Sequence, residues 1–179
     1  MESIRIHGRG GQGVVTAAEL IAIAGFYEGR ESRAFPSFGV ERSGAPIQSF
    51  ARIDDRPIIT REQVYEPSIL IIQDASLIDS VDVFSGCKKD TAVIINSPKK
   101  DWPEIKKRFP KTFLTPASEI AIRILGKNLA NTVILGALAK KTAVVSLESL
   151  KKAIKEKFAS KGAAIIEKNI KAIEEAYNL

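Results

Sequence analysis

Short apolar runs and longer runs with helical spacing alternate along this chain. Ser3–His7 alternates polar and apolar residues, as a half-buried strand does, whereas Ile69–Gln73 and Thr91–Ile95 are continuously apolar and rich in β-branched residues. Continuous runs of this kind are typical of strands buried on both faces of a sheet. Val14–Tyr27 is rich in alanine and predicts a largely buried helix.

The remaining elements follow from the same patterns. Arg33–Phe38 and Ile47–Ile53 predict strands that pair with each other or with the first strand, and Ser146 and Gly162 open two helical runs at the end of the chain. Further predicted elements are a helix at Asp101–Phe109, a strand at Thr112–Leu114, and helices at Ala117–Leu125 and Asn131–Lys141. We therefore expect a three-layer α/β/α Rossmann-like domain, with a mostly parallel sheet that has an antiparallel component. No repeat or linker divides the chain, so residues 1–179 are expected to form a single domain.

Composition and charge narrow the class of protein. The chain has 179 residues, of which 45% are hydrophobic and 27% charged, as in a soluble globular domain. No apolar run reaches the roughly 20 residues of a membrane span, and the first residues lack the apolar region of a secretory signal. We expect no membrane association and a cytoplasmic location. The net charge of +6 is not accompanied by a nucleic-acid-binding motif, and only 7% of residues are aromatic, so no nucleic-acid partner is expected.

The single cysteine limits redox and metal chemistry. Cys87 has no second cysteine with which to form an intramolecular disulfide, and one thiol cannot hold zinc or an iron-sulfur cluster. We predict no metal site in this chain, and any redox metal is expected to belong to another chain.

A glycine-rich loop carries the clearest signal for binding. Gly8-Arg9-Gly10-Gly11-Gln12-Gly13 satisfies G-x-G-x-x-G directly after a predicted strand and before a predicted helix. Glycines allow close approach of the backbone, and a helix N-terminus offers N–H groups and a positive dipole end to a phosphate or carboxylate. Arg9 and Gln12 can add side-chain donors if they turn toward that anion. The alternative is a tight turn that binds no ligand.

A dinucleotide site is less well supported. Such a site also uses an acidic residue about 20 residues later, at the end of the second strand. Glu28 and Glu31 lie near that distance, but they precede the predicted strand. Binding of NAD or FAD is therefore not favoured.

A second unusual stretch runs from Ala34 to Pro46. It combines two phenylalanines, two glycines, two prolines and the adjacent Glu41-Arg42 pair between two predicted strands. Stiff loops that hold charged side chains often serve recognition. A structural turn, with the phenylalanines in the core, is an equally good interpretation.

The other polar candidates are isolated. His7 has no visible partner residues, so we interpret it as a strand-end residue and not as a general base. Asp74 follows a predicted strand, where it either faces a ligand or caps a short helix beginning near Ala75. Asn96 follows the next strand in the same way, and Cys87 has no accompanying histidine to make it a nucleophile. We predict no catalytic residue in this chain.

Three of these segments together resemble a known family. They are Ile4-Arg5-Ile6-His7-Gly8-Arg9-Gly10-Gly11-Gln12-Gly13-Val14, the loop Phe38-Gly39-Val40-Glu41-Arg42-Ser43-Gly44-Ala45-Pro46, and Asp74 after an apolar strand. The combination is similar to the gamma subunits of 2-oxoacid:ferredoxin oxidoreductases. The resemblance spans most of the chain and is strongest in its first 75 or so residues.

The resemblance implies a multi-subunit enzyme. Such an enzyme oxidatively decarboxylates a 2-oxoacid with coenzyme A to acyl-CoA and CO2, and it reduces ferredoxin. The implied partners are alpha, beta and ferredoxin-like delta subunits. Thiamine diphosphate, Mg²⁺ and the iron-sulfur clusters are implied to lie in those subunits, so this chain should hold no cofactor and be inactive alone. The Gly-Val-Glu-Arg-x-Gly-Ala-Pro form of the loop resembles pyruvate-type subunits, with branched-chain 2-oxoacids and 2-oxoglutarate as alternatives.

The resemblance also implies roles for residues. Gly8, Arg9, Gly10, Gly11, Gln12 and Gly13 are expected to face the phosphates of coenzyme A. Phe38, Gly39, Glu41, Arg42 and Ser43 are expected to form a loop at the interface or on the substrate side. Two alternatives of other classes stay open: a free-standing nucleotide-sensing module and a structural spacer.

Overall fold

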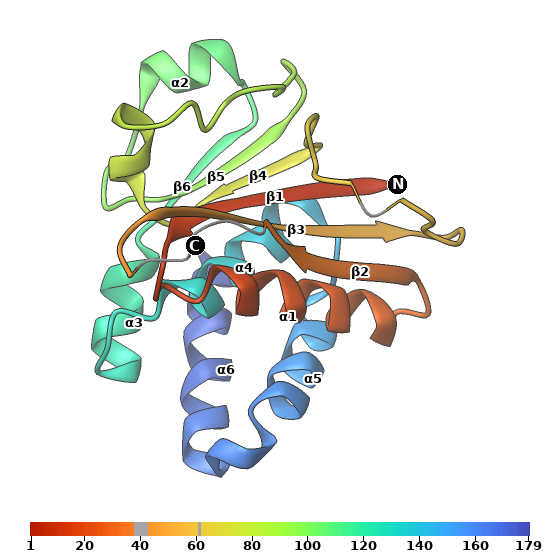
Figure 1. Ribbon diagram of the computed structural model, residues 1–179. Coiled ribbons are helices and arrows are strands. Elements are labelled where there is room, and N and C mark those ends of the chain that lie inside the picture. Colours follow the sequence, from red (N-terminus) through yellow and green to blue (C-terminus); the bar gives the residue numbers. More distant parts are fainter. Residues whose placement is uncertain (38–42, 61) are drawn as a thin grey trace.

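A six-stranded sheet forms the centre of the molecule (Figure 1). The computed structural model describes residues 1–37, 43–60 and 62–179. In the order β2-β3-β1-β4-β5-β6, the strands are Glu31–Pro36, Pro46–Asp54, Glu2–Arg9, Ile69–Ile72, Ala92–Asn96 and Thr112–Thr115. Strands β1, β4, β5 and β6 are parallel, whereas β3 runs antiparallel to both β1 and β2. The predicted mostly parallel sheet with an antiparallel component is confirmed.

The parallel register brings several turns to one edge of the sheet. Ile4 of β1 pairs with Ile69 of β4, which in turn pairs with Ala92 of β5. The carboxyl ends of these strands therefore lie side by side. The glycine-rich loop after β1, the turn after β4 and the turn after β5 all leave the sheet at this edge, which is where open α/β sheets bind ligands.

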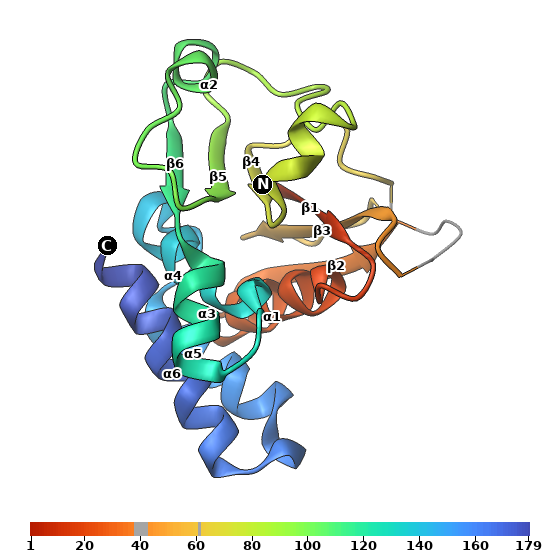
Figure 2. The same cartoon turned by 90° about the vertical axis from the view of Figure 1, so that its left-hand side faces the viewer.

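In the part of the chain that the structure describes, five helices lie on one face of the sheet (Figures 1 and 2). They are α1 (Val14–Tyr27), α3 (Ala117–Leu125), α4 (Ala130–Thr142), α5 (Leu147–Lys157) and α6 (Ala163–Asn178). Alternate strand residues such as Ile4, Ile6 and Ile71 are fully buried against this layer. The terminal pair α5 and α6 packs on α1, α3 and α4, with α3 and α6 side by side in Figure 2.

The opposite face has a thinner cover. The 3-10 helix η1 (Ala75–Asp79) and helix α2 (Pro103–Arg108) pack over β4 and β5, whose alternate residues point to this side. Leu70, Ile72 and Val93 are buried there with Phe109. The sheet thus has helices on both faces, which agrees with the predicted α/β/α layers.

Two buried arginines, Arg5 of β1 and Arg52 of β3, hold segments without regular secondary structure against that face of the sheet. Arg5 donates hydrogen bonds to the carbonyl oxygens of Val64, Tyr65, Val83 and Ser85. Arg52 donates in the same way to the carbonyls of Glu62 and Gln63. Burial lowers the pKa of both guanidinium groups, yet arginine stays charged, so main-chain carbonyls take the place of a counterion.

No helix in the described ranges is long and apolar enough to cross a membrane. Val14–Tyr27 and Ala117–Leu125 are helices over the predicted residues. The helix predicted at Asp101–Phe109 is shorter, Pro103–Arg108, and the strand predicted at Arg33–Phe38 begins two residues earlier, at Glu31, while Phe38 lies outside the described residues.

Candidate functional site at the glycine-rich loop

The glycine-rich loop joins the carboxyl end of β1 to the N-terminus of α1. Gly13 is the N-cap of α1 and has φ 70°, and Gly11 has φ 92°. Residues with a Cβ rarely adopt such angles, so glycine is needed at both positions. Gly13 supplies no side-chain cap to α1. The first N–H groups of the helix are therefore not satisfied by a cap side chain, as an anion site requires.

Two glycines of the loop, Gly8 and Gly13, lie so close to neighbouring side chains that a Cβ would not fit. A Cβ on Gly8 would come within 2.5 Å of Val14 Cγ2, and one on Gly13 would come within 2.5 Å of Asn131 Nδ2. Asn131 lies in the first turn of α4 and donates a hydrogen bond to the Gly13 carbonyl. The loop is therefore held against both the helix it opens and the start of α4.

The glycine-rich loop also pairs with the end of the second unusual stretch. The Gly10 N–H donates to the Ala45 carbonyl over 2.9 Å, and the Gly44 N–H donates to the Gly10 carbonyl over 3.0 Å. Ser43 is exposed next to this pairing. The two segments singled out in the sequence thus meet at one edge of the sheet.

An open hollow of about 470 Å³ lies against this loop. Its lining combines glycine backbone, apolar side chains and one hydroxyl: Gly10, Gly11, Gly13, Val14, Val15, Ser43 and Ile47. Backbone amides beside an apolar wall suit a ligand that carries both a phosphate and an apolar part.

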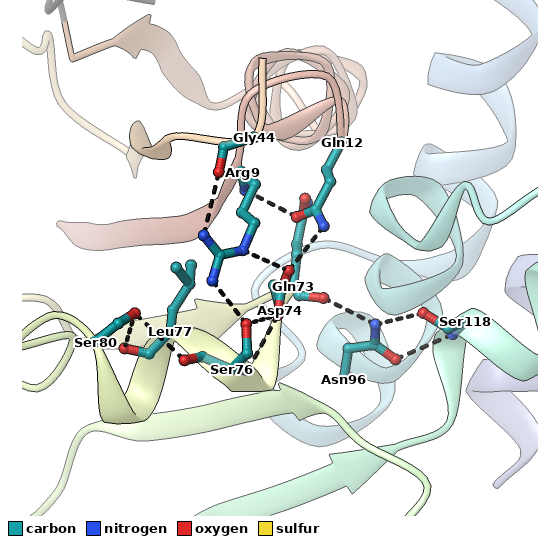
Figure 3. A network of polar contacts seen from close by, with 10 residues as sticks. All are labelled: Arg9, Gln12, Gly44, Gln73, Asp74, Ser76, Leu77, Ser80, Asn96 and Ser118. Carbon is teal, nitrogen blue, oxygen red and sulfur yellow. Dashed lines mark hydrogen bonds and ion pairs between the residues drawn. The ribbon is translucent and has the colours of Figure 1, made fainter. Parts of the chain in front are cut away.

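Arg9 and Gln12 do not line this hollow, and their side chains reach toward Asp74 (Figure 3). The Arg9 guanidinium donates to Asp74 Oδ2 at 3.1 Å, to the Gly44 carbonyl at 3.1 Å and to Ser76 Oγ at 2.8 Å. Gln12 Nε2 donates to the same Asp74 oxygen at 2.9 Å, and Gln12 Oε1 accepts the Arg9 N–H at 2.8 Å. Both side chains therefore fasten the loop to the Asp74 carboxylate.

Asp74 is the centre of that network and also the N-cap of η1. Its Oδ1 accepts hydrogen bonds from the N–H and the hydroxyl of Ser76. Burial acts to raise the pKa of Asp74, but the hydrogen bonds from Ser76 and Gln12, with the charge of Arg9, outweigh it and lower the pKa. Asp74 is thus ionised at neutral pH. Its position after β4 allows it either to face a ligand or to cap a helix, and in this structure it caps η1.

The turn after β5 is fastened in a similar way. Asn96 Nδ2 donates to the Gln73 carbonyl and to Ser118 Oγ, both over 2.8 Å, and Asn96 Oδ1 accepts the Ser118 N–H. Asn96 therefore connects the end of β4 to the first turn of α3 (Figure 3).

His7 and Cys87 lie apart from the hollow. His7 is buried in β1, and burial together with the nearby charge of Arg5 lowers its pKa to about 3. It is therefore neutral at physiological pH. Cys87 lies beside Arg5, and burial raises the pKa of its thiol despite that positive charge. The sulfur is a thiol at neutral pH, because burial outweighs the neighbouring positive charge that would favour a reactive thiolate.

The structure places most, but not all, of the predicted site. Gly10, Gly11, Gly13 and Ser43 line the hollow, whereas Arg9 and Gln12 bond to Asp74 and Gly8 packs against Val14. Phe38, Gly39, Glu41 and Arg42 lie outside the described residues. Sequence reasoning missed Ser76 and Asn131. The Asp-x-Ser spacing is a turn signal that points to Ser76, but nothing in the sequence marks Asn131.

Among the described residues no group of three or more histidine, cysteine or acidic side chains is placed to hold a metal ion.

Comparison with known proteins identifies the family of this chain. Residues 3–179 match the family model described as pyruvate ferredoxin/flavodoxin oxidoreductase. The chain is 51% identical to the pyruvate/ketoisovalerate oxidoreductases common subunit gamma of Thermococcus kodakarensis, over 99% of this chain and 96% of that one. It is also 51% identical to the pyruvate synthase subunit PorC of Methanocaldococcus jannaschii, with the same coverage of 99% and 96%.

A solved structure extends the comparison to the fold. The crystal structure of pyruvate oxidoreductase subunit PORC from Thermotoga maritima matches with a TM-score of 0.84 and 31% identity. The match covers 99% of this chain and 95% of that one. The chain therefore belongs to the pyruvate ferredoxin/flavodoxin oxidoreductase family, among its gamma subunits.

Proposed function

We propose that this chain is the gamma subunit of an enzyme that oxidises pyruvate with coenzyme A to acetyl-CoA and CO2 and reduces ferredoxin. The observation that carries the proposal is the full-length similarity to subunits whose names specify pyruvate synthase and pyruvate/ketoisovalerate oxidoreductases. Because one of those names includes ketoisovalerate, branched-chain 2-oxoacids are the second substrate class.

Within that complex, the glycine-rich loop forms part of the coenzyme A side of the active site. Coenzyme A carries phosphates and a long arm in which methyl and methylene groups alternate with two amides. The hollow beside Gly11 offers uncapped N–H groups of α1 next to Val14, Val15 and Ile47. The main chain of the loop binds a phosphate, while Arg9 and Gln12 hold the loop in shape through Asp74.

The loop that contains Phe38, Gly39, Glu41, Arg42 and Ser43 has a different role in this proposal. It meets a neighbouring subunit or the substrate side. Ser43 lies at the rim of the hollow, and Gly44 is paired with the glycine-rich loop, so a partner that contacts this stretch also contacts the coenzyme A site.

The cofactors of the reaction lie in other subunits. An iron-sulfur cluster needs about four thiolate ligands, and this chain has one cysteine, whose sulfur accepts a hydrogen bond from Arg5. Thiamine diphosphate, with Mg²⁺, would supply the carbanion chemistry of decarboxylation from the alpha and beta subunits. A ferredoxin-like delta subunit would pass electrons to ferredoxin. This chain is therefore inactive alone.

An anaerobic pull-down tests the assembly. The tagged chain is recovered from its native cells, its partners are identified by mass spectrometry, and the eluate is assayed for coenzyme A-dependent reduction of viologen by pyruvate. We expect a thiamine-binding subunit, a ferredoxin-like subunit and activity. Recovery of the chain alone, folded and binding a nucleotide, would favour a nucleotide-sensing module and overturn the proposal.

A further inference from the structure

A second, much smaller hollow lies on the other side of Gln12. Its volume is about 20 Å³, and its lining residues are Gln12, Gln73, Ser118, Asn128 and Ala130. Four of these five carry a polar side chain. The hollow thus lies between the glycine-rich loop, the end of β4 and the starts of α3 and α4.

The Gln73 side chain is the unusual feature of this hollow. The residue is only 3% exposed, yet neither Nε2 nor Oε1 of its amide finds a hydrogen-bond partner in the part of the chain that the structure describes. Its main chain is fully used, because its N–H donates to the His7 carbonyl and its own carbonyl accepts from Asn96. A buried amide without partners destabilises the folded state, so native proteins satisfy such groups with protein atoms or ordered water.

Further hydrogen-bonding groups line the same space. Ser118 Oγ accepts from Asn96, so its own hydrogen is free to donate elsewhere. Gln12 Oε1 accepts one hydrogen bond and can accept a second. Ala130 is the first residue of α4, whose N-cap Leu129 provides no side-chain cap. Donors and acceptors from three elements therefore surround the Gln73 amide.

Size determines what can bind there. A water molecule needs about 10–15 Å³ and two to four polar partners, whereas a phosphate or carboxylate group needs several times more space. We propose that this hollow binds one ordered water molecule, which hydrogen-bonds to the Gln73 amide and bridges Gln12 of the glycine-rich loop to the first turn of α3.

The water has a structural consequence that is independent of the proposed substrate. Gln12 also bonds to Asp74 and to the Arg9 N–H. A water that fixes Gln12 from its other side connects the glycine-rich loop to β4 and α3, beyond its direct contacts with Asp74. The loop is then anchored on both of its flanks.

Oxygen-17 water relaxation dispersion of the full chain tests this inference, because it counts water molecules with long residence times. The Gln73→Met variant keeps the length of the side chain and removes both amide atoms. We expect one fewer long-lived water in this variant than in the natural chain. The matched control is Asn169→Leu, which removes a buried amide that bonds to Ile165 on α6, and it should leave the count unchanged. An equal count in Gln73→Met and the natural chain would overturn the proposal.

A high-resolution crystal structure of the natural chain gives an answer even if the variant does not fold. The expected density is a single water peak within hydrogen-bond distance of the Gln73 amide and of Gln12 or Ser118. A Gln73 side chain turned to bond directly to protein groups, or a hollow filled by a protein side chain, would contradict the inference.

Discussion

Gly13 shows how one residue holds the candidate site together. Its left-handed conformation and its contact with Asn131 both exclude a side chain. We expect Gly13→Ala to lower the free energy of unfolding by about 1–2 kcal/mol from the backbone alone, with a further loss from the contact with Asn131. Urea denaturation measures this change.

Gly126→Ala is the control for that prediction. Gly126 has nearly the same φ, 73° against 70°, but a Cβ there meets nothing within 4 Å. It should therefore show the backbone cost only. Equal losses in the two variants would mean that the contact between Gly13 and Asn131 contributes nothing.

His7 makes a residue-level prediction about pH. Its pKa falls from 6.5 in the unfolded chain to about 3 in the folded one, so the unfolded chain binds more protons between these values. Its contribution to stability is complete above pH 6.5 and decreases by about 1.4 kcal/mol for each pH unit below that, until about pH 3. His7→Gln should remove this slope from a series of unfolding curves.

The same residue allows a direct check. His7 is the only histidine, so one imidazole signal is present in the NMR spectrum. We expect that signal not to titrate between pH 5 and pH 8. A midpoint near 6.5 would show that the imidazole is solvated and would contradict the buried, neutral assignment.

Residue roles were only partly predictable from the sequence. The glycines were found because strand, loop and helix are contiguous, and the loop requires that residue type. Their side-chain partners were not, since Asp74 is 65 residues from Arg9 and Asn131 is 118 residues from Gly13. The sequence shows that Arg9 can donate hydrogen bonds, but only the folded geometry shows that Asp74 and Ser76 receive them.

At the scale of elements, the central strands could be predicted from the sequence because they are buried on both faces of the sheet. Ile69–Ile72 and Ala92–Asn96 lie in the middle of the sheet with cover on both faces, so their sequences are apolar throughout and easily recognised as strands. The irregular segment between β3 and β4 was not predicted. It has no periodicity of its own, and the arginines that hold it lie in other elements.

Removal of the Arg5 guanidinium is expected to loosen that segment. Arg5→Met keeps a long apolar stem but leaves the carbonyls of Val64, Tyr65, Val83 and Ser85 without this donor. We expect at least about 3 kcal/mol less stability and faster proteolysis of the chain between β3 and β4. Arg56→Met on the exposed surface is the control and should change stability by no more than about 0.5 kcal/mol. A small effect of Arg5→Met would show that water replaces the guanidinium.

For the whole molecule, the layers and the mixed sheet followed from the order of strands and helices, and the family followed from three motifs. The expected role of the Phe38–Arg42 loop stays a prediction. Assembly could not be derived from the residues, because a surface that meets another subunit and one that meets water can share the same composition. It was expected only through the resemblance.

We propose above that the glycine-rich loop contributes to coenzyme A binding in the assembled enzyme. The most direct test of this proposal is the KM for coenzyme A of the whole complex carrying Gly11→Val, whose side chain would project at the hollow lined by Gly11. The control complex carries Gly29→Val, a glycine with a similar positive φ that lies at the far end of α1. We predict a KM for coenzyme A at least about tenfold higher in the Gly11 variant, equivalent to about 1.4 kcal/mol, with an unchanged KM for pyruvate. Equal KM values for coenzyme A in the Gly11 variant, the control and the natural complex would show that the glycine-rich loop does not contribute to coenzyme A binding.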